Sequence, residues 1–162
     1  RSNEPTVRVN GIKISVFDVS DPANPQEKYT EVIGQGNSYT ELNYNHKVLY
    51  QHPNKNLYGF PAVIFNSKLV SKGEISYYED YFNYEGAMLY EITPEEGIKL
   101  VKTLTHQEKI SHEPYFDLWP SHIVRILSIG DVIYTLSYDK MKLYDLETDH
   151  QIATIPLPDL EY

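Results

Sequence analysis

The sequence predicts an all-β fold, a β-propeller fragment of about two and a half four-stranded antiparallel blades. Three observations support this prediction. Short runs rich in Val, Ile, Thr and Tyr favour strands, and Gly, Pro, Asn and Asp between them favour tight turns. One motif also recurs along the chain, and no stretch has a helical period.

The clearest unit lies between residues 121 and 157. Its tight turns are expected at Gly130-Asp131, at Asp139-Lys140 and over 147–150. The predicted strands between these turns are 123–129, 132–138, 141–146 and 152–157. Four strands joined by hairpins form one meander, which has the size of one propeller blade.

Two further units precede this terminal blade. Residues 1–34 are predicted to hold the outer strands of a partial blade, at 6–9, 13–19 and 28–33. Residues 46–105 form a second blade, with strands at 46–51, 57–65, 86–92 and 98–105. A long polar and aromatic insert, 66–85, separates its second and third strands. Together the three units are expected to form one partial propeller domain.

The recurring motif distinguishes a propeller from a sandwich. Residues 16–19, 89–92 and 143–146 share the order apolar, aromatic, acidic, aliphatic. A sandwich would also give short strands and frequent turns, but it would not predict this recurrence, which is the signature of a repeated unit. The shared acids, Asp18, Glu91 and Asp145, are expected to accept hydrogen bonds from turn amides rather than to bind Ca²⁺.

Composition excludes several classes of function. The 41% hydrophobic and 23% charged residues are typical of a folded protein. A net charge of −9 disfavours nucleic acid and anionic membranes as partners, because both need a basic surface. No apolar run approaches the ~18 residues that span a bilayer. Cysteine is absent, which excludes disulfides and thiolate metal sites.

Three segments resemble a known family. Residues 16–25 (VFDVSDPANP), 39–65 and 124–146 are similar to the final part of a bacterial and archaeal family of secreted proteins, whose C-terminal β-propeller is distantly related to WD40 repeats. The first segment also resembles the LVIVD-type propeller repeat. The resemblance implies an extracellular or cell-surface location, with a signal peptide and earlier blades upstream of Arg1. It implies no reaction and no catalytic residues.

An incomplete ring has a physical consequence. Propellers have at least four blades, so two and a half blades leave open strand edges that invite pairing. We therefore expect this piece, studied alone, to self-associate. Size-exclusion chromatography with light scattering tests this expectation, and a monomer at high concentration would count against it.

The long segments 35–45, 66–85 and 106–121 are all expected on one rim of the propeller, with the short turns on the other. Long loops on a rigid scaffold favour a binding face for a protein, peptide or glycan. Aromatic faces beside acids suit sugar rings or basic peptides. The predicted binding residues are Tyr77, Tyr78, Tyr81, Phe82, Tyr84, Tyr115, Phe116, Trp119, Glu79 and Asp80. The competing interpretation is that these rings only anchor long loops.

Catalytic and metal motifs are lacking in the sequence. His106, His112 and His122 share one segment, but their spacing matches no zinc pattern, so ordinary surface histidines are expected. Nothing resembling GxSxG frames a nucleophile. No catalytic residue, metal or cofactor is therefore predicted.

The favoured function is a non-enzymatic extracellular binding or scaffold module that uses the loop-rich rim. The alternative is an enzyme with its active site at the central mouth of the complete propeller. In that case His, Asp or Glu side chains would converge at the ends of the predicted inner strands, 46–51 and 123–129.

Overall fold

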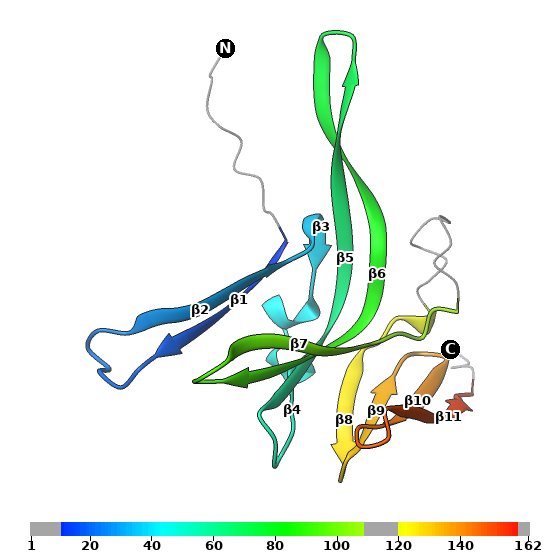
Figure 1. Ribbon diagram of the computed structural model, residues 1–162. Helices are drawn as coiled ribbons and strands as arrows, with labels where there is room; N and C mark the ends of the chain where they lie inside the picture. Colours follow the sequence, from blue (N-terminus) through cyan, green and yellow to red (C-terminus); the bar gives the residue numbers. More distant parts are fainter. Residues whose placement is uncertain (1–10, 109–119, 159–162) are drawn as a thin grey trace.

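The computed structural model describes residues 11–108 and 120–158. These residues form three antiparallel sheets with short 3₁₀ segments between strands, and no α-helix is present among them (Figure 1). The all-β fold class is confirmed. In the same ranges, no helix has the length and apolar character that crossing a membrane requires.

The first sheet is a hairpin of β1 (Ile12–Asp18) and β2 (Gln26–Ile33). Its turn is held by Asp21, whose backbone carbonyl accepts from the Asn24 N–H at 3.0 Å. The Asp18 carboxylate accepts from the Ser20 N–H at 2.9 Å, as expected for the acid of the repeated motif. The predicted strand 6–9 lies outside the described residues.

The second sheet is the largest. Its strands are β3 (Gln35–Tyr39), β4 (Tyr50–Gln51), β5 (Leu57–Lys72), β6 (Ile75–Thr93) and β7 (Gly97–Leu104). The order is β3-β5-β6-β7. β4 pairs with the start of β5, at Tyr58 and Gly59, whereas β3 pairs farther along, at Val63 and Phe65. The strands predicted at 57–65 and 86–92 therefore lie within β5 and β6, and the strand predicted at 98–105 matches β7 except for its last residue.

Two predictions in this region are wrong. The supposed polar connection 35–45 contains β3 and the 3₁₀ helix η1 (Glu41–Asn43). The first half of the supposed strand 46–51 is the 3₁₀ helix η2 (His46–Val48), and only its end, β4, is a strand. Local capping explains both helices. The Thr40 side chain accepts from the Leu42 N–H, and the Asn45 side chain accepts from the Lys47 N–H.

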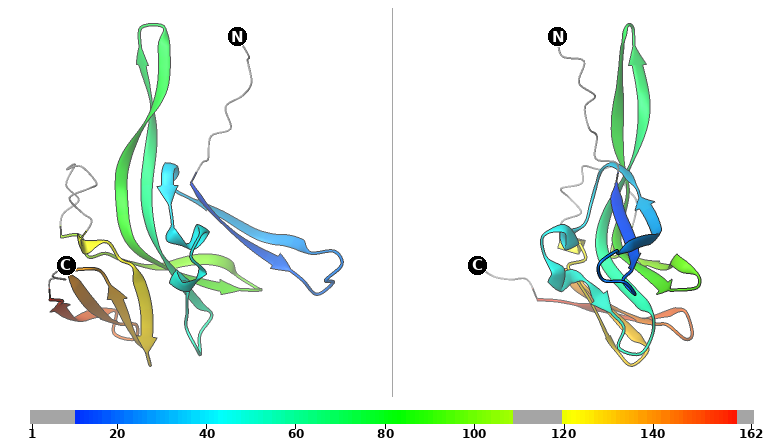
Figure 2. Two further views of the ribbon diagram at one scale, coloured as in Figure 1. Left: turned by 180° about the vertical axis from the view of Figure 1, so that it is seen from behind. Right: turned by 90° about the vertical axis from the view of Figure 1, so that its left-hand side faces the viewer.

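The largest correction concerns residues 66–85, which form a paired hairpin rather than a loop. β5 and β6 pair continuously from Leu57 opposite Glu91 to Lys72 opposite Ile75, with one bulge between Ile64 and Phe65. The distal part of this hairpin extends beyond the other labelled strands (Figures 1 and 2). We call residues 66–84 the β-arm.

The third sheet is a single meander in the order β11-β10-β9-β8. Its strands are β8 (Arg125–Ile129), β9 (Val132–Leu136), β10 (Lys140–Asp145) and β11 (His150–Pro156). All four predicted strands of this unit are present. The Asp145 carboxylate accepts from the Glu147 and Thr148 N–H groups at 2.8 and 3.2 Å, as expected for its position in the motif.

The second sheet packs against a neighbour on each face. Because side chains alternate along a strand, Leu57 and Leu89 face the third sheet while Phe60 and Tyr90 face the first. The third sheet contributes Ile133 to the first of these cores. Sheets stacked face to face in chain order are the arrangement of consecutive propeller blades.

Candidate functional site

The β-arm exposes apolar side chains on both of its faces. Cross-strand pairing places Leu69 beside Tyr78 on one face and Val70 beside Tyr77 on the other. Leu69 and Tyr78 are each 60% exposed, and Ile75 near the tip is 69% exposed. A hairpin that leaves apolar groups in solvent on two sides is an unusual surface for a folded domain and indicates a contact site.

The foot of the β-arm is fixed by polar contacts to the segment before it. The Asp80 carboxylate accepts from the Ser67 hydroxyl and, at 3.2 Å, from the Asn37 N–H. The Gln35 side chain accepts from the Ser67 N–H at 2.8 Å. The Phe82 ring packs edge-on against Phe65, with centroids 6.0 Å apart. Asp80 and Phe82 therefore hold the arm in place.

Tyr84 is also an anchor. Its hydroxyl lies 3.0 Å from both the Ala87 and the Leu104 carbonyl oxygens, which joins the base of β6 to the end of β7. Burial raises the pKa of the Tyr84 hydroxyl, so this group keeps its proton and donates. For Tyr84, the competing interpretation is therefore the right one: its ring anchors the structure and is not available to a ligand.

The other predicted binding residues divide into two sets. Tyr77, Tyr78 and Tyr81 are exposed along the β-arm, and Glu79 forms an ion pair with Lys68 at 3.2 Å across the two strands. Tyr115, Phe116 and Trp119 lie outside the described residues. The structure thus brings together three exposed tyrosines on one projecting element.

Glu85 lies directly below the β-arm and is 1% exposed. Its carboxylate accepts from the Ile123 N–H at 2.9 Å and from the Gln107 side chain at 2.8 Å, and it lies 3.2 Å from His122 Nδ1. A buried carboxylate needs such partners, because desolvation of an unpaired charge is costly. Glu85 therefore connects the second sheet to the start of the third.

His106 forms a second buried polar cluster. Its Nδ1 lies 2.7 Å from the Ser137 hydroxyl and its Nε2 lies 2.8 Å from the Thr135 hydroxyl. Ser137 also donates to the Asp139 carboxylate at 2.6 Å. His106 is 1% exposed, and His122 is buried too, so the expectation of surface histidines is wrong for both. His112 lies outside the described residues.

The cluster has the residue types of a hydrolase triad but not the arrangement. In a triad the imidazole lies between the hydroxyl and the carboxylate, whereas here Ser137 lies between His106 and Asp139. Ser137 is 2% exposed, which leaves no approach for a substrate. The geometry fits a structural network that joins the segment after β7 to the β9–β10 turn.

The charge state of His106 agrees with this structural role. Burial, followed by the nearby Lys142 and Lys140 ammonium groups, lowers the pKa of His106 to about 4, so the imidazole is neutral at pH 7. In the part of the chain that the structure describes, no group of three or more His, Asp or Glu side chains is arranged to hold a metal ion.

The lowered pKa of His106 predicts acid sensitivity. Between about pH 6.5 and pH 4 the His106 imidazole is protonated in the unfolded state but neutral in the folded state. The contribution of neutral His106 to the free energy of unfolding is therefore fully present above this window and is lost as the pH falls through it. The expected loss is on the order of 3 kcal/mol. Urea unfolding at a series of pH values measures it. His106→Gln should flatten the profile in this window, and an unchanged profile in that variant would contradict the assignment.

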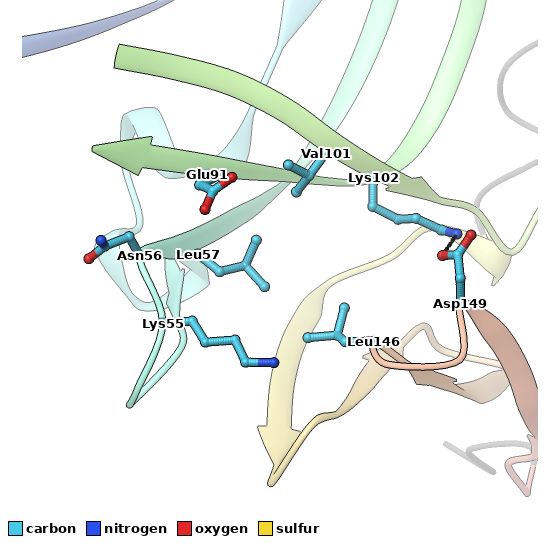
Figure 3. A pocket seen from close by; sticks show the side chains of 8 residues that line it. All are labelled: Lys55, Asn56, Leu57, Glu91, Val101, Lys102, Leu146 and Asp149. Atoms are coloured by element: carbon cyan, nitrogen blue, oxygen red, sulfur yellow. Dashed lines mark hydrogen bonds and ion pairs between the residues drawn. The ribbon is translucent and has the colours of Figure 1, made fainter. Parts of the chain in front are cut away.

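A pocket of about 250 Å³ lies between the second and third sheets, on the side of the short turns (Figure 3). Leu57, Val101 and Leu146 form its apolar part. Its two lysines are already paired, Lys55 with Asp131 at 2.5 Å and Lys102 with Asp149. These pairs neutralise both ammonium groups and leave Glu91 as the other charged side chain of the lining, so the pocket offers no free cation to an anionic ligand and is a weaker candidate than the β-arm.

Sequence reasoning placed Tyr77, Tyr78 and Tyr81 in a loop and missed the two buried clusters. Glu85 is hydrogen-bonded to Ile123, 38 residues away in the sequence, and His106 is hydrogen-bonded to Ser137, 31 residues away. No local pattern signals contacts over such separations.

Comparison with known proteins gives one result. A family model described as a beta propeller domain matches residues 1–149. No curated protein and no solved structure matches the chain. The stacked antiparallel sheets, the recurring strand motif and this match over most of the sequence agree, and the chain belongs to the beta propeller domain family.

Proposed function

We propose that this propeller domain is a non-enzymatic binding module, and that the β-arm is the element that contacts its ligand. The observation that carries this proposal is the exposure of Leu69, Ile75, Tyr77, Tyr78 and Tyr81 on a hairpin that extends beyond its own sheet. Aromatic side chains supply a large contact area at a low cost in conformational entropy and are enriched at binding hot spots.

A protein or peptide ligand fits the β-arm better than a glycan does. Sugar recognition would use the acids beside the tyrosines as hydrogen-bond acceptors. Asp80 already accepts from Ser67 and Asn37, and Glu79 is paired with Lys68. The exposed groups near the tip include Leu69, Ile75, Tyr77 and Tyr78, which supply the aliphatic and aromatic contact area found in surfaces that bind apolar side chains.

The ends of the neighbouring strands suggest how a peptide could bind. β7 pairs with β6 only from Ala87 to Thr93, and the pairing of β3 with β5 ends at Phe65. Neither strand follows the β-arm outward. An extended peptide that adds along β6 would gain main-chain hydrogen bonds, and the tyrosines would select its side chains.

The proposal includes an extracellular or cell-surface location. It rests on the resemblance of residues 16–25, 39–65 and 124–146 to secreted propeller proteins. Protease shaving of intact cells that express the full-length protein tests it. Release of peptides from this domain is expected, and their protection until the cells are lysed would contradict the location.

Replacing Tyr77, Tyr78 and Tyr81 together by serine should abolish retention of peptide ligands on a peptide and glycan array. Hot-spot aromatics each contribute about 2 kcal/mol or more, so a loss of at least ~100-fold in affinity is expected. The free energy of unfolding should change by no more than about 1.5 kcal/mol, because all three are surface substitutions.

Tyr44→Ser is the matched control for this triple variant, because Tyr44 is 78% exposed and lies outside the β-arm. It should leave array binding unchanged. Equal binding by the triple variant and the native protein would overturn the proposal, and so would a ligand retained only through sugar groups.

A further inference from the structure

The acid of the recurring motif has a different role in the second sheet. Asp18 and Asp145 each accept a hydrogen bond from the backbone N–H two residues farther along the chain. Glu91 occupies the same place in the motif, but the turn after it is capped by Thr93, whose hydroxyl accepts from the Glu96 N–H at 3.0 Å. The Glu91 carboxylate is therefore not required by its turn.

The Glu91 carboxylate instead lines the pocket between the second and third sheets. Cross-strand pairing with Leu57 places both side chains on the face of the second sheet that meets the third. Among the described residues, no hydrogen bond or ion pair engages this carboxylate, although the exposed Lys99 lies opposite it on β7. Figure 3 shows Glu91 on the opposite side of the pocket from the Lys102–Asp149 pair.

The charges around the pocket favour a cationic ligand. Lys55 and Lys102 each have an aspartate as a partner, Asp131 and Asp149. Glu91 is the charged lining residue beyond these pairs. An anion would meet ammonium groups that are already neutralised, whereas a cation would meet the Glu91 carboxylate and form a charge-assisted hydrogen bond. The net charge of −9 also favours the approach of cations.

The remaining lining and the size of the pocket define the rest of the ligand. Leu57, Val101 and Leu146 form an aliphatic surface, along which the carbon chain of an amine can pack while its charged end meets Glu91. Among the described residues, no aromatic ring lines the pocket, so it lacks the cage that suits quaternary ammonium. Sites for drug-sized ligands have volumes of about 300–1,000 Å³. The 250 Å³ of this pocket suits one side chain or a small amine.

We propose that this pocket binds a primary ammonium group at the end of an aliphatic chain. Glu91 accepts hydrogen bonds from the ammonium, and Leu57, Val101 and Leu146 contact the carbon chain. A lysine side chain of a partner protein and a free alkylamine present the same chemistry. The site is separate from the β-arm, and its ligand does not depend on the role of the β-arm.

An NMR titration of the isotope-labelled full chain with butylamine hydrochloride tests the proposal. The backbone amide signals of Leu57, Val101 and Leu146 should shift and reach saturation. Butanol has the same carbon chain without the charge, and it should bind at least ~10-fold more weakly. A capped Ala-Lys-Ala tripeptide separates the two sources of the ammonium. Shifts of the same amides would identify a lysine side chain as a ligand, and binding of butylamine alone would identify a free amine.

Glu91→Gln keeps the shape of the side chain and removes its charge, so the affinity for butylamine should fall at least ~10-fold while that for butanol stays unchanged. The matched control is Glu95→Gln, which removes the same charge from an exposed position in the following turn and should leave both affinities unchanged. Lys99→Met removes the cation opposite Glu91 and should bind butylamine at least as tightly as the native protein. Equal affinities for butylamine and butanol, or equal losses in the two glutamine variants, would overturn the proposal.

Discussion

Replacing Glu85 by alanine is expected to lower the free energy of unfolding by about 3 kcal/mol, because each buried donor that loses its acceptor costs about 1–3 kcal/mol. The carboxylate is almost fully buried and accepts from Ile123 and Gln107 beside His122. Without it, the Ile123 N–H is left without its acceptor at the junction of two sheets. Urea unfolding monitored by tyrosine fluorescence and by circular dichroism measures the change.

Glu79→Ala is the matched control for Glu85→Ala. Both residues are glutamates on β6, but Glu79 pairs with Lys68 on the surface of the β-arm. Exposed ion pairs contribute about 0–1 kcal/mol, so the control should change stability little. Equal effects of the two substitutions would contradict the role of Glu85 in joining the second and third sheets.

Gly86→Ala is expected to cost about 3 kcal/mol. Gly86 has φ 155°, and a Cβ atom there would lie 2.2 Å from the Leu104 carbonyl oxygen of the paired strand. Backbone strain at such a residue costs about 1–3 kcal/mol, and displacing β7 adds an overpacking cost of similar size. The measurement is again the free energy of unfolding.

Gly73→Ala separates the two contributions. Gly73 also has a positive φ, 62°, but a Cβ atom would meet nothing within 4 Å at the tip of the β-arm. This substitution should cost only the backbone strain, about 1 kcal/mol. If it destabilised the protein as much as Gly86→Ala, close packing at the foot of the arm would not explain the requirement for Gly86.

The sequence predicts the terminal blade well because each of its strands has local signals at both ends. Gly130-Asp131 and Asp139-Lys140 mark turns, and the runs between them are rich in Val, Ile and Tyr. The repeated acid behaves as predicted at two of its three positions, since Asp18 and Asp145 both accept from turn amides. Local chemistry decides these features, so local patterns reveal them.

The sequence does not predict that the β-arm is a pair of strands, and the reason is physical. A half-buried strand alternates apolar and polar residues because one face meets the core. The β-arm has solvent on both faces, so Tyr77 and Tyr78 are neighbours in sequence although they lie on opposite faces. The resulting mixture of polar and aromatic residues resembles a loop. Only the pairing with 66–72 identifies it as a strand.

The buried clusters around Glu85 and His106 are not predicted from the sequence, because the residues that contact each other in them are distant in sequence. Nothing near His106 indicates that its two ring nitrogens meet Ser137 and Thr135. The same holds for Glu85, which appears in the sequence as one more acid among exposed aromatic residues. Packing of the second sheet against the third brings these groups together.

The most direct test of the binding role removes the outer β-arm without disturbing its foot. Replacing residues 69–78 by Asn-Gly leaves Lys68 and Glu79 as the last pair before a two-residue turn, as Lys72 and Ile75 are in the native hairpin. The contacts of Asp80 with Ser67 and Asn37 remain. This shortened protein should keep its free energy of unfolding within about 1 kcal/mol and lose the peptide ligands that the native protein retains on a peptide and glycan array. Retention of the same ligands by the shortened protein would contradict the proposal that the β-arm is the binding element.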